Sequence, residues 1–205
     1  MNIDKEYTDK YEDYINTFIL TVGTKFYSIF KKLNFTPNML TTLSLIFGLI
    51  SYKFFSIKQF ILSSFFYFLS YSFDVLDGNY ARHTGLTSKF GDYYDHIKDI
   101  LIGILIFFAF CKYSIWNKLN FKLLLLIIII TIVLLLTIIS ELGCREVYYK
   151  KKTQKNVSFF FKYSYLFCPK YLNKNLYVNK YIGSGTFTLW ICFLIFSNNL
   201  DSLMK

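Results

Sequence analysis

Five aspartates fall within a stretch of 26 residues, although long parts of the chain carry no acidic residue. Helical spacing places Asp74 with Asp77 on one face of one segment, and Asp95 with Asp99 on one face of another. A solvated acidic loop is the simpler alternative, and this spacing argues against it. Two helices that each present two carboxylates repel one another unless a counter-charge lies between them. The fifth aspartate is Asp92.

A divalent cation is the counter-charge that best fits these ligands. Four carboxylates provide hard oxygen ligands of the kind that Mg²⁺ or Mn²⁺ prefers. Beside them, Gly78 and Ala81 lack bulk, so an extended ligand can approach the backbone closely. Arg82 is one of only two arginines in the chain, and its planar guanidinium suits a phosphate or a diphosphate. Together these residues predict a site for a metal-bound diphosphate.

The composition predicts that this site is carried by a membrane protein. Of the 205 residues, 54% are hydrophobic and only 18% are charged, whereas a soluble domain carries about 25% charged residues. Disordered, collagen-like and coiled-coil chains are excluded on the same ground. The net charge of +10 would suggest a nucleic-acid partner in a soluble protein. Beside long apolar segments it favours anionic lipid headgroups instead, so no nucleic acid is expected.

The elements that must position the aspartates are apolar helices. We expect an all-α polytopic fold of about six transmembrane helices, each using about 20 mostly apolar residues. Residues 1–35 form the predicted juxtamembrane part, with an interfacial amphipathic helix over 11–33, and residues 36–200 form the transmembrane domain. The third span continues a helix that begins near Gly91. The uncharged stretches are 37–52, 59–73, 100–111, 123–140 and 181–200, with a weaker sixth at 157–168.

Basic residues predict the orientation of these spans. Lysines precede the first span, a basic run follows the fourth, and Arg82 and Lys89 lie between the second and third. If the spans alternate, all three groups lie on one side, which the positive-inside rule makes cytosolic. The N-terminus lacks an apolar core region, so no cleavable signal peptide is expected. The four cysteines are widely spaced, and we expect neither a disulfide framework nor a zinc site.

The aspartates also belong to a longer pattern. Residues 74–99 follow D-x2-D-G-x2-A-R-x8-G-x3-D-x3-D, with Gly91 as the second glycine. This pattern resembles the signature of the CDP-alcohol phosphatidyltransferase family, with all eight fixed residues in register. A second short match, Thr36-Pro37-Asn38-Met39-Leu40-Thr41, is similar to the segment that opens the first span in that family. The resemblance is close over these two segments and rests elsewhere on size and span count.

The resemblance implies six transmembrane helices, a homodimer and an active site near the cytosolic face. It implies Mg²⁺- or Mn²⁺-dependent transfer of a phosphatidyl group from CDP-diacylglycerol to a small polar alcohol, with release of CMP. Asp99 is the candidate general base, although cations beside it would weaken it as a base. The implied residues are Asp74, Asp77, Asp95 and Asp99 for the metal, Asp99, Asp95 and His96 for catalysis, and Gly78, Ala81, Arg82, Gly91 and Asn38 for the cytidine diphosphate.

Two other interpretations stay open. Asp95-His96-x-x-Asp99, preceded by Asp92, is similar to choline and ethanolamine phosphotransferases, which use a CDP-aminoalcohol and diacylglycerol; there Asp92 and His96 would assist deprotonation. A non-enzymatic divalent-cation carrier would also contain intramembrane acids at helical spacing, but it has no need of the small residues and arginine beside them. Arg145 either binds an acceptor phosphate or acts as an inside-positive anchor.

Overall fold

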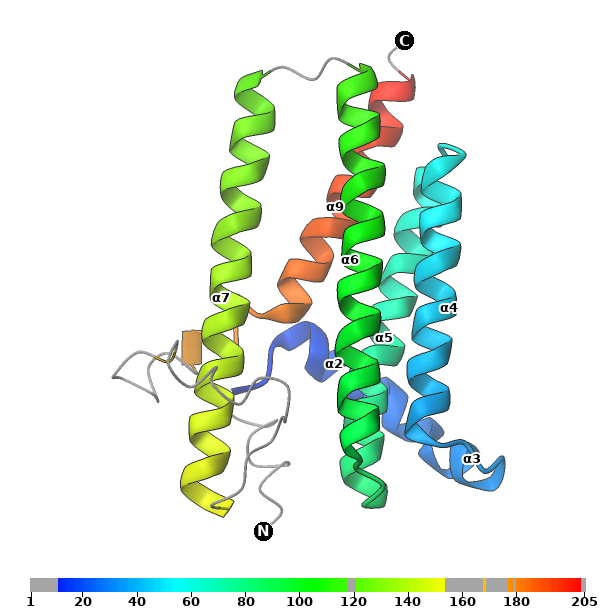
Figure 1. Ribbon diagram of the computed structural model, residues 1–205, viewed down its shortest axis with the longest axis vertical. Helices are drawn as coiled ribbons and strands as arrows, with labels where there is room; N and C mark the ends of the chain where they lie inside the picture. Colours follow the sequence, from blue (N-terminus) through cyan, green and yellow to red (C-terminus); the bar gives the residue numbers. More distant parts are fainter. Residues whose placement is uncertain (1–10, 118–120, 154–167, 169–176, 179, 204–205) are drawn as a thin grey trace. The chain divides into compact units, whose positions relative to one another are not determined.

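A computed structural model describes residues 11–117, 121–153, 168, 177–178 and 180–203. Every regular element within these ranges is a helix, as the apolar sequence predicts, and they contain no strand. The chain divides into two compact units, Met1–Phe18 with Phe121–Phe187, and Ile19–Asn120 with Thr188–Lys205. The helices (Figure 1) are α2 Tyr14–Gly23, η1 Thr24–Phe26, α3 Tyr27–Lys32, α4 Pro37–Ser56, α5 Phe60–Thr84, α6 Lys89–Asn117, α7 Phe121–Thr153 and α9 Ser184–Leu203.

Helix α4 begins where the sequence provides both a cap and a proline. Thr36 has an extended backbone, and its hydroxyl accepts a hydrogen bond from the Met39 N–H at 3.3 Å. Pro37 occupies the first turn, where its missing N–H costs no hydrogen bond. One face of α4 is buried, at intervals of three or four residues, through Pro37, Leu40, Thr41, Ser44, Gly48, Ser51 and Phe55. This face packs against both α5 and α6.

Small residues bring α4 close to its neighbours. Ser51 and Ser63 donate hydrogen bonds to each other's carbonyl oxygens at 2.8 and 2.9 Å, and Ser70 donates to the Ser44 carbonyl at 2.8 Å. On the α6 side, a Cβ added at Gly48 would lie only 2.7 Å from Ile102 Cδ1. Small and hydroxyl-bearing residues permit this approach between helices in an apolar environment. The α4–α5 and α4–α6 contacts thereby bring three helices together around one face of α4.

The chain reverses between α5 and α6 through a short connection. Gly85 has φ of 72°, the left-handed conformation that glycine adopts most readily, and it ends α5. Ser88 then begins α6, because its hydroxyl accepts a hydrogen bond from the Gly91 N–H at 3.0 Å. As a result, the C-terminal end of α5 and the N-terminal end of α6 lie at the same end of this unit as the start of α4 (Figure 1).

The amphipathic segment before α4 is helical but interrupted. The single helix expected over 11–33 is instead α2, η1 and α3. The interruption follows Gly23, whose Cα lies so close to the Leu76 side chain on α5 that a Cβ there would overlap it. The predicted apolar stripe is exposed along these elements, at Phe18, Val22, Phe26, Ile29 and Leu33.

Helix α3 is attached to α5 by Tyr27. Its buried hydroxyl donates a hydrogen bond to Asn79 Oδ1 at 2.8 Å, and its ring meets Tyr80 edge to face at 5.0 Å. Burial raises the pKa of the Tyr27 phenol, so the group stays protonated and able to donate. Tyr27 therefore holds the amphipathic segment against α5 at Asn79, the residue that follows Gly78.

In the other unit, two acids bind the first residues of α9. Asp13 Oδ1 accepts the Ile15 N–H at 2.7 Å at the start of α2, and its Oδ2 accepts the Thr186 N–H at 3.2 Å. Glu141, buried on α7, accepts the Ser184 N–H at 3.0 Å. Carboxylates at helix N-termini satisfy unpaired N–H groups and favour the helix dipole. Asp13 and Glu141 thus have a structural role that the sequence did not suggest.

Cys144 and Cys168 form a disulfide in this unit. The expectation that the cysteines form no disulfide is therefore wrong for this pair. Sequence separation concealed it, because a helix and a distant segment must meet before the two sulfur atoms can approach. Cys111 and Cys192 are free.

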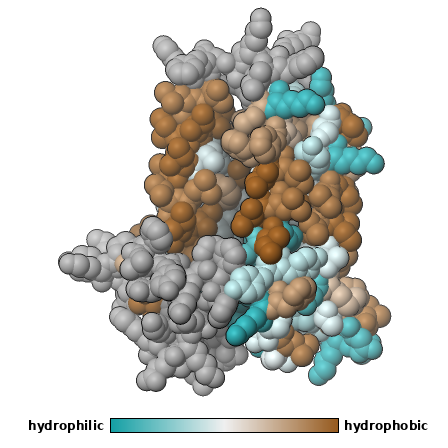
Figure 2. Space-filling view, viewed as in Figure 1, coloured by the Kyte–Doolittle hydropathy of each residue, from teal (hydrophilic) through white to brown (hydrophobic). Residues whose placement is uncertain are grey.

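Within the described part of the chain, two helices are long and apolar enough to cross a membrane, Pro37–Ser56 in α4 and Leu124–Arg145 in α7. The predicted first and fourth spans correspond to these helices. The predicted stretches 59–73, 100–111 and 181–200 fall mostly within α5, α6 and α9. The sixth stretch, 157–168, lies outside the described residues apart from Cys168. The apolar residues of α7 are largely exposed (Figure 2), including Leu126, Ile129, Val133 and Leu136, as expected for side chains that contact lipid.

Candidate active site

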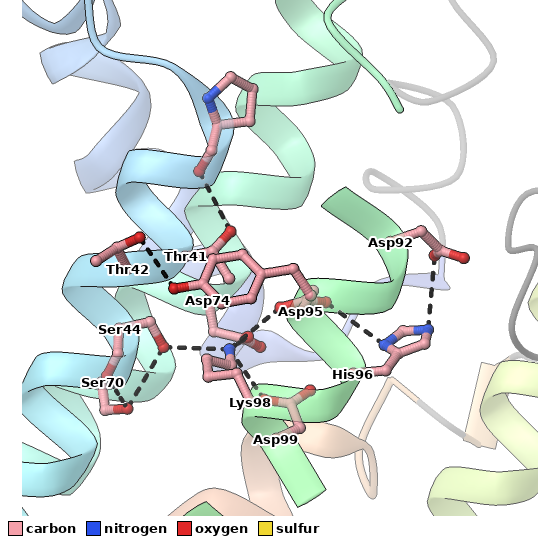
Figure 3. A network of polar contacts seen from close by, with 12 residues as sticks. Thr41, Thr42, Ser44, Ser70, Asp74, Asp92, Asp95, His96, Lys98 and Asp99 are labelled. Carbon is pink, nitrogen blue, oxygen red and sulfur yellow. Dashed lines mark hydrogen bonds and ion pairs between the residues drawn. The ribbon is translucent and has the colours of Figure 1, made fainter. Parts of the chain in front are cut away.

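The four predicted metal ligands come together at one end of the α4–α6 unit. Asp74 and Asp77 lie toward the C-terminal end of α5, and Asp95 and Asp99 lie near the N-terminal end of α6. Figure 3 shows Asp74, Asp95 and Asp99 close to one another. Ligand oxygens of Asp74, Asp77 and Asp95 all lie within 4.8 Å of one another. Three carboxylates at this separation are able to share a divalent cation. The chain folds this way because the short α5–α6 connection brings both ends back to α4.

Exposure differs among the four carboxylates. Asp77 is 4% exposed, whereas the side chain of Asp99 is 52% exposed. The other two aspartates have intermediate exposure. Asp99 is therefore the carboxylate that a molecule arriving from outside the helices would meet first.

Asp77 carries the clearest sign that a cation belongs here. Its Oδ2 is buried and has no hydrogen-bond partner among the described residues. A buried carboxylate oxygen without a partner is costly, because it has lost its hydration. A divalent cation held by Asp74, Asp77 and Asp95 would satisfy this oxygen, and hard oxygen ligands are the ones that Mg²⁺ or Mn²⁺ takes. The residues present therefore fit the predicted metal.

A lysine that sequence reasoning did not include lies in the middle of the site. Lys98, on α6, forms an ion pair with Asp74, and its Nζ lies 3.1 Å from Asp95 Oδ1 and 2.9 Å from Asp99 Oδ1 (Figure 3). It also donates a hydrogen bond to Ser44 Oγ on α4 at 3.2 Å. One signal was available in the sequence. Lys98 follows Asp95 by three residues, which places both on one helical face.

His96 lies between two carboxylates of its own helix. Its Nε2 is 3.6 Å from Asp92 Oδ1, and its Nδ1 is 3.6 Å from Asp95 Oδ2. Burial of the imidazole opposes protonation, but the adjacent Asp95 and Asp92 carboxylates outweigh this effect and raise the pKa of His96. His96 precedes the uncharged stretch 100–111 of α6, so it lies where α6 is still polar. The structure thus places His96 beside Asp92, the pair that the aminoalcohol interpretation requires.

Two residues expected in the cytidine diphosphate pocket are in direct contact. A Cβ added at Gly91 would lie 2.9 Å from Asn38 Oδ1 and 3.1 Å from Ser88 Oγ. The glycine therefore leaves room for the Asn38 amide and the Ser88 hydroxyl at the start of α6. This contact joins the Thr36–Thr41 segment to the aspartate pattern, which the sequence presents as two separate matches.

The other pocket residues follow the acids on α5, with Gly78 directly after Asp77 and with Ala81 and Arg82 about one turn further on. Gly78 and Ala81 are half-buried, and Arg82 Nη1 would lie 3.5 Å from a Cβ at Gly78. The guanidinium therefore passes over the space that the glycine leaves open. Arg145 is on α7 in the other unit, and its predicted role at an acceptor phosphate stays a prediction.

The chain belongs to the CDP-alcohol phosphatidyltransferase family, because a profile of that family matches residues 34–196. This family consists of membrane transferases of phosphate-containing groups that act in phospholipid synthesis and generally depend on a divalent metal. The match includes α4, α5 and α6 and every predicted site residue. Neither a curated protein nor a solved structure matches the chain.

Proposed function

We propose that the protein transfers a phosphatidyl group from CDP-diacylglycerol to a small polar alcohol and releases CMP, with Mg²⁺ or Mn²⁺ bound by the aspartates. The observation that carries this proposal is the meeting of Asp74, Asp77 and Asp95 around the unpartnered Asp77 oxygen. The family match supports the reaction class. The Gly91–Asn38 contact supports the proposal that these residues line a shared nucleotide pocket.

The roles of the residues follow from their exposure and charge. The acceptor oxygen forms a bond to the phosphatidyl phosphorus, the bond from that phosphorus to CMP breaks, and Asp99 takes the acceptor proton. Asp99 suits this role because it is the most exposed of the four carboxylates. The Arg82 guanidinium binds the diphosphate. The nucleotide pocket is lined by Gly78, Ala81, Gly91 and Asn38. A divalent cation at the aspartates would stabilise negative charge on the departing CMP.

The proposed setting is a multi-pass membrane protein with this site at the cytosolic face, acting as a homodimer. The exposed apolar stripe of α2 to α3 supports an amphipathic segment that lies in the membrane interface. In Figure 2 the apolar surface over α4 to α6 changes to hydrophilic residues toward the end that carries the aspartates. A site at this boundary would be reached by both a lipid donor and a water-soluble acceptor.

The test is acceptor-dependent CMP release by the purified protein in lipid. CDP-diacylglycerol is supplied with a panel of polar alcohols and Mg²⁺ or Mn²⁺. We expect CMP with one alcohol, none after chelation, and none with Asp77→Ala. The matched control is Asp201→Asn, a carboxylate change near the end of α9, which should retain activity. Full activity of Asp77→Ala would overturn the metal site.

A second candidate function rests on His96. Its position between Asp92 and Asp95 favours a CDP-aminoalcohol phosphotransferase. In such an enzyme, Asp92 and His96 would assist deprotonation of the diacylglycerol hydroxyl. CMP release only from CDP-choline or CDP-ethanolamine with diacylglycerol would support this function over the first. The carrier interpretation predicts metal flux into sealed vesicles without any CDP-lipid, and such flux without CMP release in either assay would support it.

A further inference from the structure

Lys98 brings a fixed positive charge into the group of carboxylates that the family resemblance assigns to metal. Its side chain is 3% exposed and bridges both helices that carry the aspartates, by contacts to Asp74 on α5 and to Asp95 and Asp99 on α6. An ammonium has three N–H donors and no acceptor. All three can be satisfied by these carboxylates and by Ser44, so the lysine is held from three helices.

The carboxylates form two overlapping groups in which a cation would fit. One group is Asp74, Asp77 and Asp95, and the other is Asp95, His96 and Asp99. Lys98 contacts both aspartates of the second group, Asp95 and Asp99, and in the first group it contacts Asp74 as well as the shared Asp95. Asp77 contributes a buried carboxylate oxygen, Oδ2, that has no hydrogen-bond partner among the described residues. The ammonium therefore already contacts both aspartates of the second group, whereas in the first group the buried Asp77 oxygen is left for another cation.

We propose that Lys98 serves as a built-in cation in place of a second metal ion, so that this chain binds one divalent ion, at Asp74, Asp77 and Asp95. This proposal rests on the proposed function, because it assumes the metal site described above. Each carboxylate has two oxygens and can contact the ammonium with one and a metal with the other. A second divalent ion at Asp95 and Asp99 would lie beside an ammonium of like charge that is not free to leave, and this repulsion disfavours its binding.

The proposal predicts a metal stoichiometry that the lysine controls. Mn²⁺ is titrated into purified protein in detergent, and binding to a variant in which Asp74, Asp77, Asp95 and Asp99 are all replaced by Ala is subtracted as background. Bound ions are counted, and their electron paramagnetic resonance spectrum is recorded. The native chain should bind one Mn²⁺ with an uncoupled six-line spectrum. Lys98→Met should bind two, with the spin coupling of neighbouring ions. Lys98→Arg, which keeps the charge, should bind one.

The control is Lys112→Met, an exposed lysine farther along α6, which should leave the count at one. Two ions in the native chain, or one in a folded Lys98→Met, would overturn the proposal. Lys98→Gln provides a second neutral variant that can still donate to Ser44. If neither neutral variant folds, the count in the native chain decides, since one ion supports the proposal and two refute it.

Failure of the proposed function would look different. Absence of specific Mn²⁺ binding by the native chain would remove the metal site and the inference together. One bound ion without CMP release would leave the inference standing and refute the proposed reaction.

Discussion

At the scale of single residues, the site combines groups whose positions the aspartate pattern does not reveal. Gly91 is one of the eight fixed positions, and its contact with Asn38 shows what the glycine does. A residue without a Cβ leaves room for the Asn38 amide beside the start of α6. We therefore expect Gly91 to act by positioning Asn38, which in the proposed function borders the nucleotide.

This expectation gives a prediction for Gly91→Ala. The new methyl group would displace the Asn38 amide, which is the end of a flexible side chain, so folding should be little affected. Alanine also gains about 1 kcal/mol of helix propensity over glycine. We expect an unchanged or slightly higher Tm and a severalfold higher KM for the CDP donor. Asn38→Ala should raise KM similarly, and the double variant should show less than the product of the two effects. A lower Tm with unchanged KM would contradict this account.

At the scale of elements, α4 organises the site by packing on both aspartate-bearing helices. Its small residues set the distances, because Ser44, Gly48 and Ser51 all lie on the buried face. Farther along the same unit, a cluster of buried apolar side chains holds the helices together, formed by Phe55, Phe60, Ile102, Ile106 and Ile195. A substitution that separates α4 from α6 should therefore shift the positions of the aspartates, although none of them is replaced.

Gly48→Ala tests this role of the helix contact. The added methyl group would overlap Ile102, and overpacking of this kind costs about 1–3 kcal/mol. We expect a lower Tm in detergent and lower transferase activity. Ile102→Val in the same chain should recover part of both. The matched control is Gly103→Ala, because a Cβ there meets nothing within 4 Å. Equal Tm values for Gly48→Ala and Gly103→Ala would show that the contact between Gly48 and Ile102 does not limit the stability of the protein.

At the scale of the whole molecule, the proposed topology follows from the order of the helices. The α4–α5 connection and the α5–α6 connection lie at opposite ends of α5. If α5 crosses the membrane, these connections face opposite sides. Arg82 and Lys89 flank the second connection, which the positive-inside rule assigns to the cytosol together with the aspartates.

Cysteine labelling checks this assignment. Ile57 and Thr87 are exposed residues of the two connections, and each is replaced by Cys in separate variants. In sealed vesicles with the cytosolic face outward, a membrane-impermeant maleimide should label Thr87→Cys and leave Ile57→Cys unlabelled until the vesicles are opened. The native chain provides the background from its own cysteines. Labelling of both positions in sealed vesicles would refute a spanning α5.

The sequence by itself determined the apolar helices that carry the aspartates, because apolar stretches, the Thr36–Pro37 start and Gly85 act locally through hydrogen bonds and backbone preference. It also predicted which aspartates share a helical face, since residue type and helical spacing are local properties. Only the tertiary structure decided what lies between the helices. Lys98 was one lysine among many until α4, α5 and α6 met around it, and Cys144 had no visible partner until Cys168 came within bonding distance. Contacts between residues far apart in sequence depend on how helices pack, and the spacing of residues along one helix does not specify which helices pack against it.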